Sequence, residues 1–64
     1  MLDHIRDIAE EICRDVTGRE YSALTEPSAI TDLFRKAIIV RYLRDGIEPH
    51  WVDATTVDEM RRFV

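Results

Sequence analysis

Two histidines in this chain are each followed three residues later by an aspartate: His4 by Asp7, and His50 by Asp53. Residues three apart on a helix share a face, so each pair could place an imidazole and a carboxylate beside one metal ion. A convincing metal site needs about four converging ligands, and the signal here is weak, because His4 lies on the polar face of its expected helix and His50 lies on a connection beside Trp51. We therefore predict no metal site, and we interpret both histidines as solvated or locally hydrogen-bonded.

The other reactive residue types point to packing and surface charge rather than to catalysis. Cys13 is the only cysteine and falls at the edge of an apolar stripe, where a thiol behaves as a small hydrophobic group. The sequence contains neither a glycine-rich phosphate loop nor a nucleophile elbow. Adjacent acids such as Glu10 and Glu11 are typical of a solvated helix surface. The sequence predicts a chain that is not an enzyme and binds no cofactor.

The length and composition indicate one small acidic domain spanning residues 1–64. The chain carries a net charge of −4, and its residues are 45% hydrophobic and 34% charged, which is typical of a foldable globular protein. A single cysteine allows no intramolecular disulfide, and no apolar run approaches the roughly 20 residues of a membrane span. The N-terminus also lacks the pattern of a secretory signal. We expect a cytoplasmic protein that does not associate with membranes.

The elements that must position these residues are predicted to be helices. A first helix is expected from about Asp3 to Thr17, because its apolar residues recur at steps of three and four and Gly18 follows as a stop. These apolar residues are Leu2, Ile5, Ile8, Ala9, Ile12, Cys13 and Val16.

A second, longer helix is expected from Glu26 to Asp45. Thr25 is the predicted cap, and Pro27 suits the first turn because no hydrogen bond is lost there. Gly46 should end the helix, with Ile47 folding back in a Schellman arrangement. The alternative is a strand over residues 37–43, which are rich in β-branched residues. We favour the helix because the chain offers no second strand to pair with.

Thr55 or Thr56 should cap a third, short helix, since Thr56 and Glu59 match a capping box. Trp51 and Val52 are the expected anchors of the connection that precedes it. The predicted fold class is therefore all-α: a small three-helix domain with a long central helix.

The predicted central helix is apolar on more than one side. On a helical wheel, Ile39 and Leu43 lie roughly opposite the main stripe. That stripe consists of Ile30, Leu33, Phe34, Ala37 and Val40. Either the first and third helices together with Trp51 cover both sides, or the second side is a patch covered by another chain. If that chain is identical, a two-fold homodimer is the default geometry.

The predicted function is protein–protein interaction, as a regulatory or inhibitory subunit or a small adaptor. The contact would bury the second apolar side, with arginines favouring correct encounter and with aromatic and arginine side chains carrying much of the energy. The predicted partner-binding residues are Ile39, Tyr42, Leu43, Arg41, Arg44 and Trp51.

A nucleic-acid-binding module is the alternative hypothesis. Between Leu33 and Arg44 the chain carries cations and no acid, and such clusters can bind phosphates. The cations are Arg35, Lys36, Arg41 and Arg44. Against this hypothesis stand the negative net charge and a connection of roughly eight residues between the second and third helices, which is longer than a helix-turn-helix allows.

Overall fold

A computed structural model describes residues 2–64 of the chain, with side chains described from residue 4 onward. The elements in chain order are α1 (Leu2–Thr17), the 3-10 helix η1 (Tyr21–Ala23), α2 (Pro27–Arg44), α3 (Ala54–Met60) and the 3-10 helix η2 (Arg61–Phe63). No strand occurs within residues 2–64, and α2 is helical through residues 37–43. The all-α prediction, with three helices and a long central one, is confirmed.

None of the helices in residues 2–64 has both the length and the apolar character needed to cross a membrane.

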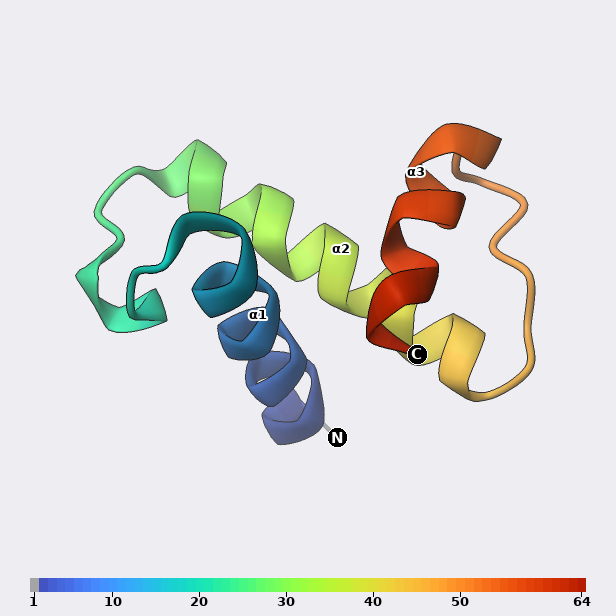
Figure 1. The fold of residues 1–64 in the computed structure, drawn as a ribbon, viewed down its shortest axis with the longest axis horizontal. Coiled ribbons are helices and arrows are strands. Elements are labelled where there is room, and N and C mark those ends of the chain that lie inside the picture. Colours follow the sequence, from blue (N-terminus) through green and yellow to red (C-terminus); the bar gives the residue numbers. More distant parts are fainter. Residues whose placement is uncertain (1) are drawn as a thin grey trace.

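Helix α1 buries one apolar side and runs in the opposite direction to α2, crossing it at an angle (Figure 1). Its fully or almost fully buried residues are Ile8, Ala9, Ile12 and Cys13. The helix ends as predicted at Gly18, whose φ of 71° lies in the left-handed region that favours glycine. The Gly18 amide donates to the Arg14 carbonyl at 3.0 Å, so the last turn of α1 is closed by the backbone itself.

The two ends of α2 differ in how well they match the prediction. Glu26, rather than Thr25, occupies the N-cap position, and its side chain makes no capping bond. Pro27 opens the helix, where its missing N–H leaves no partner unsatisfied. At the other end the predicted Schellman arrangement is confirmed: the Ile47 amide donates to the Tyr42 carbonyl at 2.9 Å, and Gly46 adopts a φ of 77°.

Helix α3 begins earlier than predicted because Asp53 caps it. The Asp53 carboxylate accepts a hydrogen bond from the Thr56 amide at 3.0 Å and another from the Thr56 hydroxyl at 2.9 Å. The prediction that Thr55 or Thr56 would be the cap is therefore wrong. A carboxylate three residues ahead of Thr56 already satisfies that amide, so the helix starts at Ala54.

Helix α2 is buried on two nearly opposite sides. Ala37 and Ile39 are both 0% exposed, although a rotation of 100° per residue directs their side chains about 160° apart. Helix α2 contacts α1 and also α3 and η2, and Figure 1 shows α1 and α3 beside different parts of it. Met60 of α3 and Phe63 of η2 are buried in the same core cluster as Ile39. The intramolecular core therefore covers both predicted apolar sides.

A pair of matched substitutions tests this two-sided burial. Ile39→Val should lower the free energy of unfolding by about 1 kcal/mol, because a buried methylene is lost and a small cavity remains. Ile38→Val removes the same group from the next position, where the side chain is partly exposed, and should cost less than about half as much. Both changes exchange one β-branched residue for another in mid-helix, so their effects on helix propensity are similar. Urea unfolding of the dilute protein, followed by far-ultraviolet circular dichroism, measures the difference. Equal losses would contradict the assignment of Ile39 to the core.

Candidate functional site

Four of the large apolar side chains that remain exposed gather around the C-terminal end of α2, and we call them the aromatic patch: Ile38, Tyr42, Ile47 and Trp51. The Tyr42 and Trp51 rings meet edge to face, with centroids 5.8 Å apart and planes at 84°. Ile38 lies one helical turn before Tyr42 on the same side of α2. The Ile47 amide is bonded to the Tyr42 carbonyl, which fixes Ile47 beside the helix end.

The aromatic patch stays open to solvent in the single chain. Tyr42 is 38% exposed and Trp51 50% exposed, so the largest aromatic side chain of the protein is only half covered. The other strongly exposed apolar residues, Val16 and Val64, lie outside this group. Isolated apolar residues on a surface need no explanation, but an exposed pair of aromatic rings in contact, with further exposed apolar residues on the same helix face and at the helix end, is typical of a contact surface.

The loop that carries Trp51 is held in place on both sides of it. Pro49 is buried and Val52 packs against the core. The Glu48 carboxylate accepts a hydrogen bond from the Arg61 guanidinium at 2.7 Å, and this bond is the main reason that the pKa of Arg61 is raised. Asp53, two residues after Trp51, caps α3. The exposure of Trp51 thus follows from a fixed loop path.

The structure brings together only some of the predicted partner-binding residues. Tyr42 and Trp51 form the centre of the aromatic patch, and half-buried Arg41 donates to Asp45 at 3.2 Å. Ile39 leaves no surface for a partner, because α3 and η2 complete the core around it; its assignment as a contact residue is corrected. Leu43 is half buried and packs against the same core.

Sequence reasoning missed two members of the patch, Ile38 and Ile47. Ile38 precedes Tyr42 by four residues, the spacing that places two side chains on one helix face. Ile47 follows the glycine that ends the helix and was expected to fold back in a Schellman arrangement, which places it beside the last turn of the helix, so its position near Tyr42 could also have been derived. Both signals were present in the sequence.

Arg44 joins three elements of the fold. Its Nε and Nη2 atoms donate to the Phe63 carbonyl of η2 at 3.2 and 2.5 Å, and Nη2 also lies 3.5 Å from a Glu11 carboxylate oxygen of α1. These contacts occupy the guanidinium, which was predicted to bind a partner. The geometry therefore supports a structural role for Arg44 in holding η2 on the core.

The four cations predicted for nucleic-acid binding do not form one basic face. At 100° per residue they are spread around most of the circumference of α2. Three are paired with acids: Lys36 with Asp32, Arg41 with Asp45, and Arg44 with Glu11. Arg35 is exposed and forms no ion pair with the acids whose side chains the structure describes. This arrangement gives a phosphate backbone no continuous track of positive charge.

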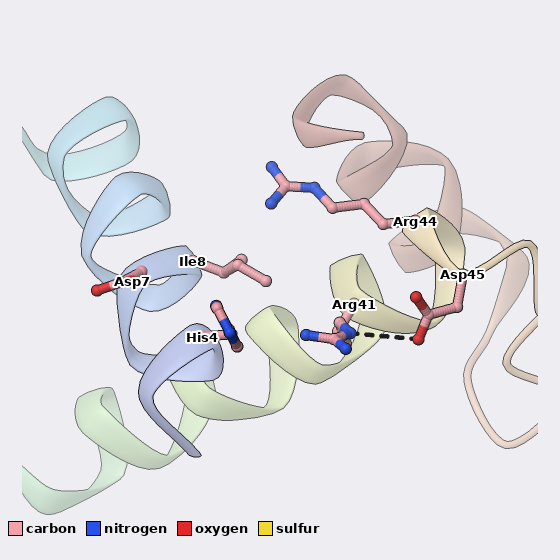
Figure 2. Close-up of a pocket in the computed structure, with 6 residues that line it drawn as sticks. All are labelled: His4, Asp7, Ile8, Arg41, Arg44 and Asp45. Carbon is pink, nitrogen blue, oxygen red and sulfur yellow. Dashed lines mark hydrogen bonds and ion pairs between the residues drawn. The ribbon is translucent and has the colours of Figure 1, made fainter. Parts of the chain in front are cut away.

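An open cleft of about 340 Å³ lies between the start of α1 and the end of α2 (Figure 2). Its lining residues are His4, Asp7, Ile8, Arg41, Arg44 and Asp45. The cleft mixes both signs of charge, and Arg41 and Arg44 are already engaged by Asp45 and Phe63. Within the described part of the chain, no three His, Cys, Asp or Glu side chains are grouped closely enough to hold a metal ion. His4, Asp7 and Asp45 line this cleft but are not among such a group.

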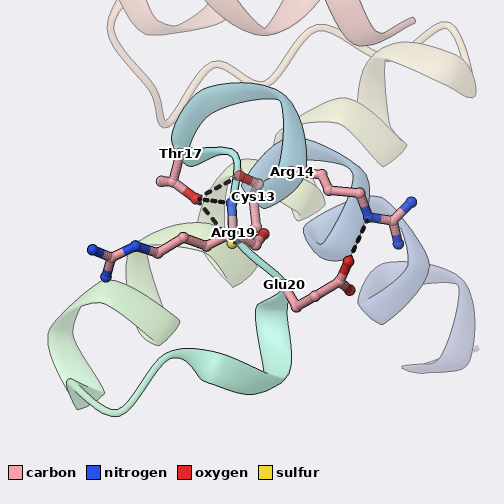
Figure 3. A network of polar contacts seen from close by, with 5 residues as sticks. All are labelled: Cys13, Arg14, Thr17, Arg19 and Glu20. Atoms are coloured by element: carbon pink, nitrogen blue, oxygen red, sulfur yellow. Dashed lines mark hydrogen bonds and ion pairs between the residues drawn. The ribbon is translucent and has the colours of Figure 1, made fainter.

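Cys13 belongs to a small polar network at the end of α1 (Figure 3). Its thiol lies 3.5 Å from both the Thr17 hydroxyl and the Arg19 carbonyl, and the side chain is fully buried. The Thr17 hydroxyl donates to the Cys13 carbonyl at 2.7 Å and accepts from the Arg19 amide at 3.1 Å. These contacts fix the turn after α1, and burial keeps the thiol away from solvent.

The Asp53 cap should make stability depend on pH in the acid range. Hydrogen bonds from the Thr56 amide and hydroxyl hold the pKa of Asp53 below its ordinary value. The folded state therefore gains stability from this carboxylate at neutral pH, and loses it as the pH falls through the lowered pKa. Asp53→Asn should keep a capping oxygen but lose this part of the pH dependence, whereas Asp53→Ala should lose both. Thermal unfolding from about pH 6 down to about pH 2 measures the effect. A pH profile of Asp53→Asn that matches the original protein would contradict this role.

The Arg44 contacts predict that removing the Arg44 guanidinium destabilises the fold more than removing the Glu11 charge. Arg44→Met keeps the apolar stem but leaves the Phe63 carbonyl without its charged donor, and should lower the free energy of unfolding by about 1–2 kcal/mol. Glu11→Gln removes only an exposed ion pair and should cost less than about 0.5 kcal/mol. Amide hydrogen exchange in α3 and η2 should accelerate selectively in Arg44→Met. Similar exchange in the two variants would show that the Phe63 contact is unimportant.

Comparisons of this chain with protein families, with curated proteins and with solved structures find no match.

Proposed function

We propose that this chain is a protein–protein interaction module, a regulatory or inhibitory subunit or a small adaptor, that binds its partner through the aromatic patch. One observation carries the proposal: the exposed edge-to-face pair of Tyr42 and Trp51, flanked by Ile38 and Ile47. Tyrosine and tryptophan are enriched among the residues that dominate binding energy, since each covers a large area at a small cost in side-chain entropy.

The rigidity of the surroundings supports this role. Trp51 is flanked by the buried Pro49 and by the α3 cap at Asp53, so a partner would meet a surface that is already ordered. Preformed surfaces lose little conformational entropy on binding, which leaves more of the interaction energy for affinity.

The charges around the patch favour a protein over a nucleic acid. Arg41 and Asp45 form an ion pair beside Tyr42, so the rim carries both signs. A rim of mixed charge can match a complementary protein surface and reject partners that place like charges opposite it. The proposal assigns no reaction to the chain. Its proposed setting is the cytoplasm, where a lone cysteine such as Cys13 stays a thiol.

Site-specific photo-cross-linking in cells that naturally produce the chain tests the proposal. A photoreactive phenylalanine analogue at Trp51 should capture one or a few defined protein chains on irradiation, whereas the same analogue at Glu59, an exposed position of α3, should capture none of them. The added variant Tyr42→Ala should reduce capture from position 51 by about tenfold or more, which is the effect of losing a central aromatic contact.

Three results would contradict the proposal: no protein captured at position 51, equal capture at position 59, or capture unaffected by Tyr42→Ala. Circular dichroism of each purified variant shows whether the fold is retained. If Tyr42→Ala unfolds, Ile38→Ser replaces it, because Ile38 belongs to the same patch and is only partly covered by the core.

A further inference from the structure

We infer that the partner of the aromatic patch is a second copy of this chain, bound so that two α2 helices run antiparallel about a two-fold axis. The inference rests on the proposed function, because it names the occupant of the same surface. It is carried by the order of residues along the exposed side of α2.

That order is symmetric about residue 40. Ile38 and Tyr42 lie two residues to either side of it, and Arg35 and Asp45 lie five residues to either side. In an antiparallel pair centred at this point, Ile38 of one copy comes to the level of Tyr42 of the second copy. Arg35 comes to the level of Asp45 of the second copy in the same way. A two-fold axis produces each of these contacts twice.

Three of these residues lie on one exposed arc of α2, and Asp45, the residue that caps its C-terminal end, continues that arc. At 100° per residue they fall within about 80° of the helix circumference, with the apolar pair in the middle and the charged pair at the edges. Each of the four is exposed, while Ala37, Ile39 and Val40 on the other sides are fully buried. The arc therefore has an apolar centre and a charged rim, which is the usual anatomy of a protein interface.

The two ends of this arc carry opposite charges, and this determines the direction of the pair. Arg35 forms no ion pair with the described acids, although its positive charge is the weakest of the influences that lower the pKa of Asp53. Asp45 is engaged by Arg41 through Oδ2, which leaves Oδ1 for a further donor. An antiparallel pair brings Arg35 to Asp45 at both ends. A parallel pair would bring Arg35 to Arg35 and Asp45 to Asp45, which is unfavourable.

The position of Trp51 extends the same surface. Trp51 packs against Tyr42, so a second helix laid on Ile38 and Tyr42 would also contact the indole. A standard interface buries about 800 Å² on each partner, which would be a large part of the 4510 Å² surface of this small chain. The four-residue patch and its rim are smaller than that, so we expect a weak dimer with a dissociation constant of about 10–100 µM.

Charge exchange across the interface provides the test. Sedimentation equilibrium of the purified protein from about 10 µM to about 1 mM should show a monomer–dimer equilibrium. Arg35→Glu and Asp45→Arg should each raise the dissociation constant by about tenfold, because each places like charges together twice. An equimolar mixture of the two variants should dimerise like the original protein, since both contacts then join opposite charges again. Arg19→Glu makes the same charge change away from α2 and should leave the dissociation constant within about twofold.

The outcomes separate this inference from the proposed function. A chain that stays monomeric up to about 1 mM, a dimer unaffected by Arg35→Glu, or a mixture that fails to associate would overturn the antiparallel dimer. If another protein is still captured at position 51 in such a case, the proposed function stands with a different partner. If neither a second copy nor any other protein is captured, both are rejected. Circular dichroism shows whether each charge variant is folded. If Arg35→Glu or Asp45→Arg does not fold, Ile38→Glu is used instead to disrupt the dimer.

Discussion

The rest of this structure depends on the need to bury α2 on two nearly opposite sides. One helix can cover only one of them, and α1 does so with a single apolar stripe. The chain must therefore reverse after α2 and return to the side where Ile39 lies. The left-handed backbone of Gly46 makes the reversal, Asp53 starts the returning helix, and Arg44 holds the Phe63 carbonyl at the end of η2. Each of these local features helps to bury the two sides of α2. A chain of 64 residues has few apolar residues beyond those needed for this core.

The exposed surface follows from the same geometry. Once two sides of α2 are covered, the remaining arc holds Ile38 and Tyr42, and the returning loop passes close enough for Trp51 to meet the Tyr42 ring. Most cations of α2 are engaged within the fold, by Asp32, Asp45 and Glu11. The surface that stands out chemically is consequently aromatic and apolar rather than basic. It owes its form to the path by which the chain completes its core.

Local signals in the sequence were enough to predict most of the fold. The steps of three and four in α1, Pro27 at the start of α2 and Gly46 at its end all act over a few residues, and each was predicted correctly. The cap of α3 was predicted wrongly because both Asp53 and Thr56 are residue types that cap helices. The sequence does not show which of the two side chains bonds to a backbone amide of the first turn, and in the fold it is Asp53. The residues of the candidate site could not be predicted in the same way, because their exposure depends on contacts between residues far apart in the sequence. Whether Ile39 or Ile38 faces solvent is decided by where Met60 and Phe63 pack, more than twenty residues away in the chain, and helical periodicity alone does not give that.

The aromatic patch is built entirely from residues 38–51, whereas the core joins residues from α1 to η2. A substitution at Trp51 or Ile47 touches few of the contacts that hold the helices together, because both side chains are at least half exposed. Under the proposed function, partner preference and stability would be encoded in largely separate sets of positions. A lineage carrying this fold could exchange one partner for another through a few changes in a single short segment, with little selection against them from loss of folding.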